Sequence, residues 1–210
     1  MDLLFVADPL EHFKTYKDTT FSMMREAARR GHRLWACEPH DLVWTRGARV
    51  LARAARCIAL RERPGQAQDA HDPWFDVPQQ RELALADAGA VLMRKDPPFD
   101  SEYFYATHLL QQAEREGARV FNKPAALREH PEKLAILEFP QFIAPTIVTR
   151  EAAALRAFHA EHHDIILKPL DGMGGMGIFR VGADGLNLGS IIETLNVNGA
   201  VTVMAQKYLT

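Results

Sequence analysis

A lysine followed by a glycine-rich run is the stretch of this sequence best suited to chemistry. Lys168 ends the short apolar run 165–167, and residues 171–177 read Asp-Gly-Met-Gly-Gly-Met-Gly. Glycine has no side chain, so such a loop brings backbone N–H groups close to an anion. The lysine amine stands at the entrance of the same loop. The pattern indicates a phosphate-binding site, although a β-hairpin with a long glycine turn explains the glycines equally well.

The residues after the glycines separate the kinds of phosphate loop. Gly172, Gly174 and Gly177 match Gly-x-Gly-x-x-Gly, but a dinucleotide-binding fold needs this fingerprint to open a helix. Residues 178–181 read Ile-Phe-Arg-Val, which favours a strand. A Walker A loop is excluded because no Gly-Lys-Ser/Thr closes the run. We therefore expect strand, loop and strand, with the loop lying as a flap over phosphates.

A second charged group follows another apolar run. Residues 90–93 read Ala-Val-Leu-Met, and Arg94 and the run Lys-Asp-Pro-Pro-Phe-Asp at 95–100 come directly after them. Two consecutive prolines exclude helix and fix the backbone, so the charges are held just past a strand end. Arg94 can bind a carboxylate through two parallel hydrogen bonds. The pattern favours recognition of a zwitterionic or carboxylate ligand; a surface cluster of ion pairs is the alternative.

The start of the chain predicts the parallel α/β unit that positions such groups. Residues 3–7 form an apolar run typical of a buried strand. A helix over 21–30 follows, with Thr19 or Thr20 as its cap, and 32–37 is the second strand. Ligands of such units bind at the carboxyl ends of the strands.

By this rule Asp8 and the segment 17–19 face a crevice, although simple capping and a surface loop explain them as well.

The rest of the chain is divided by its apolar periodicity and its Gly and Pro positions. The further strands expected are 90–93, 119–122, 146–148, 165–168, 178–181 and 201–205, and the further helices are 101–116, 129–138, 150–162 and 188–196, with helical turns over 81–87 and a loop over 66–80.

Composition describes an ordinary globular chain of 210 residues with 47% apolar and 25% charged residues. The formal net charge of −2 gives no electrostatic case for nucleic acid or for an anionic membrane as the main partner. The two cysteines, Cys37 and Cys57, have no metal-type spacing and suit a reducing cytoplasm. The arginine-rich segment 46–63 forms either a basic patch or, as we favour, an exposed hairpin or paired edge strands.

Five runs, in this order, resemble the bacterial glutathione synthetase family of the ATP-grasp superfamily: 17–21, 92–100, 122–124, 165–175 and 205–209. The resemblance covers nearly the whole chain. It implies an α/β fold, with a parallel-sheet pre-ATP-grasp domain over 1–122 and the smaller α+β N-terminal lobe of an ATP-grasp module over 123–204. Residues 205–210 would begin the hinge to a C-terminal lobe.

The resemblance also implies an activity and its residues. The family joins γ-glutamylcysteine to glycine with ATP and Mg²⁺ through an acyl phosphate. Phosphoryl transfer of this kind needs positioning and charge neutralisation more than covalent chemistry. The implied nucleotide-binding residues are Lys123 and Lys168 on the phosphates, Gly172, Met173, Gly174 and Gly175 in the flap, and Gln206, Lys207, Tyr208 and Leu209 in an adenine-binding hinge. The implied peptide-substrate residues are Lys17, Asp18, Thr19 and Arg94, with Lys168 and Arg94 as the candidate catalytic groups.

Family members continue past the hinge into a lobe that carries the magnesium ligands, so we expect no metal site within these 210 residues. We expect this chain alone not to turn over, and a homo-oligomeric, cytoplasmic protein. Two alternatives stay open: a non-catalytic nucleotide-binding fragment, and an ATP-grasp ligase for another amino-acid pair. A dinucleotide oxidoreductase is disfavoured because a strand follows the glycines.

Overall fold

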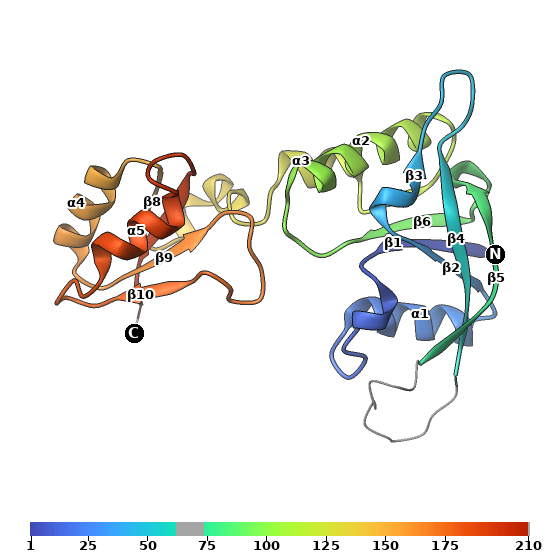
Figure 1. Ribbon diagram of the computed structural model, residues 1–210, viewed down its shortest axis with the longest axis horizontal. Helices are drawn as coiled ribbons and strands as arrows, with labels where there is room; N and C mark the ends of the chain where they lie inside the picture. Colours follow the sequence, from blue (N-terminus) through green and yellow to red (C-terminus); the bar gives the residue numbers. More distant parts are fainter. Residues whose placement is uncertain (62–73, 210) are drawn as a thin grey trace. The chain divides into compact units, whose positions relative to one another are not determined.

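The computed structural model describes residues 1–61 and 74–209, which form two compact units (Figure 1). Unit 1 comprises Met1–Asp96 and Asp100–Glu129, and unit 2 comprises Pro97–Phe99 and His130–Thr210. The two units therefore divide between residues 129 and 130. The domain boundary that the sequence predicts at 122/123 stays a prediction.

Unit 1 is built on a mixed sheet, which in its described residues has seven strands in the order β3-β4-β2-β1-β6-β7, with β5 paired to β4. The parallel strands are β1 (Asp2–Ala7), β2 (Arg33–Cys37), β6 (Ala90–Arg94) and β7 (Val120–Phe121), and the antiparallel ones are β3 (Leu42–Val43), β4 (Leu51–Leu60) and β5 (Phe75–Ala84). The helices are α1 (Thr19–Arg29), α2 (Ser101–Arg115) and α3 (Pro124–Glu129), with short 3₁₀ turns at Leu10–His12, Pro39–Asp41 and Leu85–Asp87.

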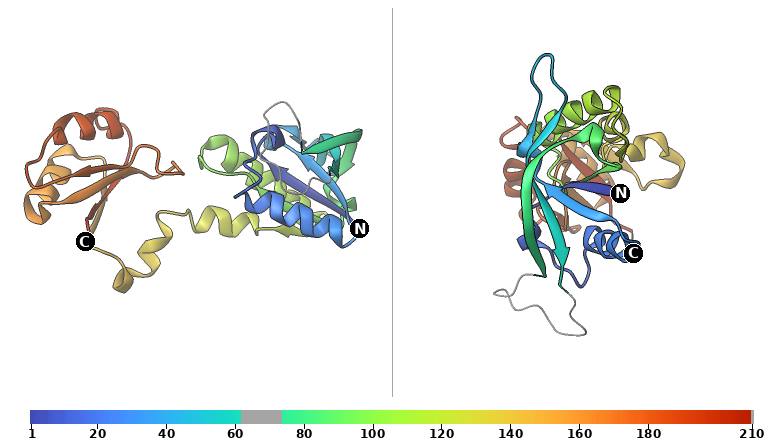
Figure 2. Two further views of the ribbon diagram at one scale, coloured as in Figure 1. Left: turned by 90° about the horizontal axis from the view of Figure 1, so that it is seen from below. Right: turned by 90° about the vertical axis from the view of Figure 1, so that its right-hand side faces the viewer.

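Helices α1 and α2 lie on opposite faces of this sheet (Figures 1 and 2). Phe5 and Leu34 pack with Met24 of α1 in a buried core. The central strand β1 is buried on both faces from Leu4 to Ala7, as the continuous apolar run predicts for a parallel strand. The predicted parallel β–α–β opening is therefore confirmed.

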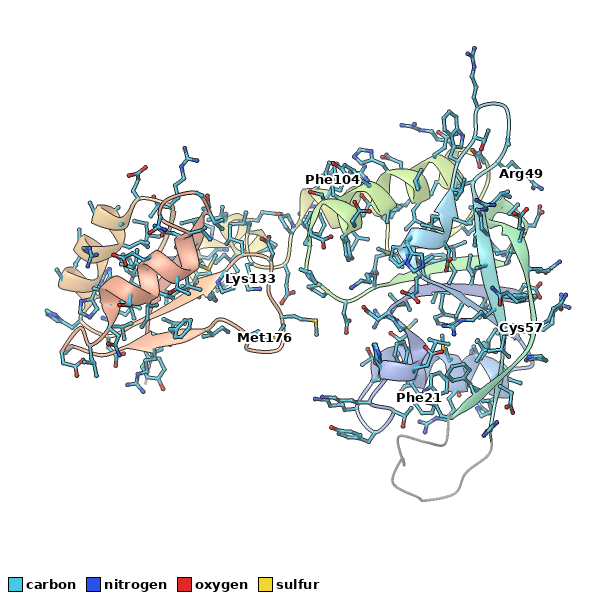
Figure 3. The ribbon with its side chains drawn as sticks, in the orientation of Figure 1. Phe21, Arg49, Cys57, Phe104, Lys133 and Met176 are labelled. Atoms are coloured by element: carbon cyan, nitrogen blue, oxygen red, sulfur yellow. The ribbon has the colours of Figure 1, made fainter. Side chains whose placement is uncertain are left out.

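Four arginines of the segment 46–63 are paired with carboxylates rather than gathered into a basic patch. The ion pairs are Arg49–Asp87, Arg53–Glu82, Arg56–Glu11 and Arg61–Asp76. Strand β4 carries Arg53 and Arg56, while Arg49 and Arg61 flank it. The strand pairs antiparallel with β5, and Figure 3 labels Arg49 and Cys57 on this part of the chain. The prediction of paired strands is confirmed, and Arg63 lies outside the described residues.

Unit 2 holds an antiparallel sheet that, in the described residues, has four strands in the order β10-β9-β11-β8. The strands are β8 (Thr146–Thr149), β9 (Ile165–Pro169), β10 (Phe179–Val181) and β11 (Val203–Lys207); the helices are α4 (Ala152–His162) and α5 (Leu188–Asn196), and 3₁₀ turns span Ala135–Glu138 and Pro140–Phe142. Leu155 of α4 and Ile192 of α5 pack against Leu167 and Ala205. Strand, loop and strand at β9 and β10 are confirmed.

Some predicted elements are wrong, each for a local reason. The caps of α1 and α2 are Asp18 and Asp100, whose carboxylates accept backbone N–H groups at 2.8 and 2.9 Å. Thr19 and Thr20, predicted as the cap of α1, instead begin that helix. The helix predicted over 129–138 is replaced by α3, which ends at Glu129, and by a 3₁₀ turn. Pro131 explains the break, because proline interrupts a helix.

The strand β5 replaces the loop predicted for 75–80 and the helical turns predicted for 81–84. The rest of the predicted loop, up to residue 73, lies outside the described residues. Trp74 and Phe75 are buried. Among residues 1–61 and 74–209, no helix is long and apolar enough to cross a membrane.

Candidate functional site

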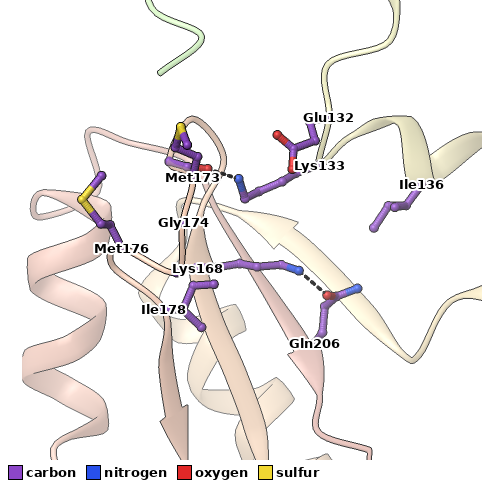
Figure 4. A pocket seen from close by; sticks show the side chains of 11 residues that line it. Glu132, Lys133, Ile136, Lys168, Met173, Gly174, Met176, Ile178 and Gln206 are labelled. Carbon is purple, nitrogen blue, oxygen red and sulfur yellow. Dashed lines mark hydrogen bonds between the residues drawn. The ribbon is translucent and has the colours of Figure 1, made fainter. Parts of the chain in front are cut away.

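The sheet of unit 2 has a core face and a polar face, and Lys168 lies on the polar one. Leu167 and Ala205 point into the core under α4 and α5. Side chains alternate along a strand, so Lys168 of β9 and Gln206 of β11 point to the opposite face. Lys168 is opposite Met204 in the register, which places it diagonally from Gln206, and its Nζ donates to Gln206 Oε1 at 2.6 Å (Figure 4).

The glycine loop beside Lys168 needs glycine for two different reasons. Gly174 and Gly175 have φ values of +63° and +80°, where a side chain is strained. At Gly172, an added Cβ would meet Pro169 Cγ at 3.2 Å. Within the described part of the chain, the backbone N–H groups of Gly174 and Gly175 donate to no protein acceptor. The loop therefore offers free donors on a backbone that an anion can approach closely.

Lys133 is the second cation of this site, and the sequence analysis missed it. Its Nζ donates to the carbonyl oxygen of Gly172 at the start of the loop. Lys133 lies beside the glycine loop, which itself carries Met176 (Figures 3 and 4). No local pattern singles out Lys133, because it lies in a segment predicted as an ordinary helix over 129–138, and only the fold brings it to Lys168.

The lysines and the loop line one pocket of about 330 Å³. Its lining residues are Glu132, Lys133, Ile136, Lys168, Gly172, Met173, Gly174, Gly175, Met176, Ile178 and Gln206. Two ammonium groups, free backbone donors, the Glu132 carboxylate and several apolar side chains share this space. Such a set suits a ligand with a strongly anionic part and an apolar part.

The charge on Lys168 is destabilised by its surroundings in the pocket. Burial lowers the pKa of Lys168, the positive charge of Lys133 lowers it further, and Glu132 acts in the opposite direction. A bound polyanion would stabilise both ammonium groups at once. The pocket is therefore electrostatically prepared for phosphate groups.

The predicted peptide-substrate residues lie in unit 1, and the structure brings only some of them together. Arg94 donates from NH2 to Thr19 Oγ1 at 2.8 Å and from Nε to Thr20 Oγ1 at 3.1 Å. Asp18 is occupied as the helix cap. Lys17 lies over the ring of Tyr16 instead. Arg94 keeps further N–H donors for a ligand.

The other charges after β6 are tied to the end of β1. Lys95 forms an ion pair with Asp8 at 2.8 Å, and the backbone N–H of Asp96 donates to the same carboxylate. Burial raises the pKa of Asp96, and the charges of Asp8 and Asp18 raise it further. The carboxyl ends of β1 and β6 thus gather a charged cluster with Arg94 beside it.

The remaining predicted site residues have partners of their own. Lys123 belongs to unit 1, where its Nζ forms an ion pair with Glu114 at 3.2 Å. In the predicted hinge, the backbone N–H of Lys207 donates to Pro145 and that of Tyr208 to Asp164, each at 2.9 Å. These two donors are therefore occupied. The side chain of Leu209 is exposed.

Comparisons with known proteins match both parts of the chain. The family described as "Prokaryotic glutathione synthetase, N-terminal domain" matches residues 1–128, and "Prokaryotic glutathione synthetase, ATP-grasp domain" matches residues 132–210. The glutathione synthetase of Ralstonia nicotianae is 58% identical over 209 residues, and that of Neisseria meningitidis serogroup A is 52% identical over 210 residues. All of this chain is covered, and it spans 62% and 64% of the length of these two relatives.

Solved structures share the fold at lower identity. D-cycloserine synthetase DcsG aligns with a TM-score of 0.58 at 17% identity, covering 100% of this chain and 60% of that one. The RimK domain ATP-grasp protein from Sphaerobacter thermophilus aligns with a TM-score of 0.57 at 19% identity, covering 100% and 65%. The fold is therefore α/β of the ATP-grasp type.

Proposed function

Because the chain belongs to the prokaryotic glutathione synthetase family, we propose that the protein is an ATP-dependent carboxylate–amine ligase that joins γ-glutamylcysteine to glycine. Unit 2 binds the phosphates of ATP, and unit 1 contributes the peptide-substrate residues. The pocket of Lys133, Lys168 and the glycine loop carries this proposal, because the two ammonium groups and the free backbone donors of Gly174 and Gly175 suit an oligophosphate.

The residues of unit 2 bind and orient the nucleotide. The Lys168 ammonium contacts a phosphate oxygen and neutralises charge while the terminal phosphoryl group moves to the cysteine carboxylate. Lys133 supplies the second cation. The resemblance gives that second place to Lys123, whereas the pocket lining supports Lys133, and separate variants of the two lysines distinguish the assignments.

The glycine loop closes over the transferred group. Water would hydrolyse an acyl phosphate, so the loop must exclude it until the glycine amine attacks. The exposed side chain of Met176 and the neighbouring Ile178 give the loop an apolar inner border. In unit 1, Arg94 binds a carboxylate of the peptide with the N–H groups that Thr19 and Thr20 do not use.

Mg²⁺, which the family implies, would neutralise phosphate charge when bound. Among residues 1–61 and 74–209, no group of three His, Cys, Asp or Glu side chains could hold a metal ion. The described residues therefore do not fit a protein-held magnesium site. On the family resemblance we retain ATP with Mg²⁺ as the nucleotide form, a cytoplasmic location and a homo-oligomer as parts of the proposal.

The test follows one oxygen atom. The protein purified from its source is incubated with ATP, Mg²⁺, glycine and γ-glutamylcysteine that carries ¹⁸O in its cysteine carboxylate. We expect glutathione, ADP and inorganic phosphate with one ¹⁸O, because the carboxylate oxygen leaves with the phosphoryl group. Label in AMP would indicate an adenylate instead, and glutathione formation without ATP would overturn the proposal. Replacing glycine by other amines tests the alternative amino-acid pairs.

A further inference from the structure

A chain of three hydrogen bonds runs across the polar face of the unit-2 sheet and ends at Lys168. The hydroxyl of Thr146 donates to the carbonyl oxygen of Ala144 at 2.7 Å. Gln206 Nε2 donates to Thr146 Oγ1 at 2.9 Å, and Lys168 Nζ donates to Gln206 Oε1 at 2.6 Å. Thr146 of β8 is directly opposite Gln206 of β11 in the sheet register. Thr146 does not line the pocket itself.

The first bond of the chain fixes the direction of the others. A hydroxyl has one proton, and the proton of Thr146 is used on Ala144, so Thr146 Oγ1 can only accept from Gln206. The NH₂ end of the Gln206 amide must then face Thr146, and its oxygen must face Lys168. Lys168 is a donor with no acceptor capacity, so only this orientation gives the ammonium group a partner.

We propose that Thr146 is a positioning residue that holds the Gln206 amide oxygen toward Lys168 and thereby keeps the ammonium group charged and aimed into the phosphate pocket. This inference rests on the proposed nucleotide-binding function of that pocket. Thr146 acts through Gln206 and touches no phosphate in this arrangement.

The electrostatics of the pocket explain why an acceptor is needed there. Burial and the charge of Lys133 disfavour the protonated form of Lys168, and the charge of Glu132 favours it. A hydrogen bond to an oxygen favours the charged form. If Thr146 loses its hydroxyl, the Gln206 amide is free to rotate and to present its NH₂ group, which repels an ammonium group. Lys168 would then lose its proton at a lower pH and lose its fixed direction.

The test measures ATP affinity by calorimetry across a pH series in the same protein that the ligase test uses and in its variants. Thr146→Val removes the hydroxyl at nearly constant side-chain volume, and Thr146→Ser keeps the hydroxyl. Thr194→Val is the matched control, because the Thr194 hydroxyl donates to Ser190 on α5, outside the pocket. We expect T146V to weaken ATP binding on the order of tenfold, or about 1.4 kcal/mol, and to move the loss of affinity to lower pH. T146S and T194V should bind as the wild type does.

A double-mutant cycle shows whether Thr146 acts through Gln206. Gln206→Met removes the acceptor for Lys168 directly, and it carries the test alone if circular dichroism shows T146V unfolded. The T146V/Q206M double variant should bind no more weakly than Q206M, because the relay is already broken. Losses of ATP affinity that add up in the double variant would overturn the proposal. Wild-type affinity and pH dependence in T146V or in Q206M would overturn it as well. Absence of ATP binding in the wild type would overturn the proposed function and this inference with it.

Discussion

Lys133 and Lys168 line one pocket with the glycine loop, and the charge of Lys133 helps to lower the pKa of Lys168. Burial is the larger cause of that shift. Two neighbouring ammonium groups repel each other unless an anion lies between them. The pair therefore favours a ligand with several negative charges, and this property leads to the first prediction.

ATP affinity should fall with rising pH before an ordinary lysine titrates. Lys168 binds phosphate best when protonated, and its pKa is lowered from the model-compound value of 10.5. Lys133→Ala removes the repulsion between the two ammonium groups. In this variant Lys168 should lose its proton, and ATP affinity should fall, at a higher pH than in the wild type. Calorimetry across a pH series measures the effect, and ¹³C NMR of the lysine side chains locates the titration of Lys168. A Lys168 that titrates at 10.5 or above would contradict the prediction.

The same shift has a defined sign for stability. Between the lowered pKa of folded Lys168 and its unfolded value, the unfolded chain binds more protons than the folded one. The free energy of unfolding contributed by this group therefore rises with pH through that interval. In Lys168→Met, urea unfolding should show this part of the pH dependence removed. An unchanged slope would mean that Lys168 is not the titrating group.

A methyl group added to the glycine loop should weaken ATP binding as well as lower the stability of the protein. Gly175→Ala adds a Cβ at a φ of +80° with no atom within 4 Å, so only backbone strain is introduced, about 1 kcal/mol. Gly31→Ala is the matched control, since Gly31 has a φ of +75° and equally open surroundings in unit 1. We expect thermal unfolding to show similar losses and calorimetry to show weaker ATP binding only for G175A. Equal ATP affinities would contradict the flap role.

Arg94 should affect the peptide substrate and not the nucleotide. Arg94→Ala removes the donors that Thr19 and Thr20 orient, and we expect γ-glutamylcysteine binding to weaken at least tenfold while ATP affinity stays constant. Arg25→Ala, which removes an α1 arginine that lies over the ring of Phe21, is the control. Titration calorimetry with each ligand separates the two effects, and a loss of ATP affinity alone would remove Arg94 from the peptide site.

The two cysteines should differ in reactivity. Cys37 lies on β2 and is 3% exposed, and burial raises the pKa of its thiol. Cys57 on β4 is half-buried. Because the thiolate is the reactive form, iodoacetamide should modify Cys57 first in the native protein and both residues after unfolding. Peptide mass spectrometry follows each site, and equal native rates would show that β2 is not buried as described.

The sequence predicted what local patterns encode and missed what the tertiary fold assembles. Lys168 and its loop are adjacent in the chain, so the strand before the loop and the strand after it could be predicted from the sequence. Strand β5 was not, because it pairs with β4 alone and its exposed residues 76–82 show no apolar alternation. Lys133 was missed for a similar reason, since only folding brings it to Gly172.

We propose that Lys133, Lys168 and the glycine loop bind the phosphates of ATP. Calorimetry of ATP binding to the wild type and to the variants K133A, K168A and K123A measures whether they do. Lys123, which pairs with Glu114 in unit 1, is the exposed comparison. We predict that K133A and K168A each weaken binding at least tenfold and that K123A binds close to wild type. Strong loss in K123A, with K133A unchanged, would contradict the account.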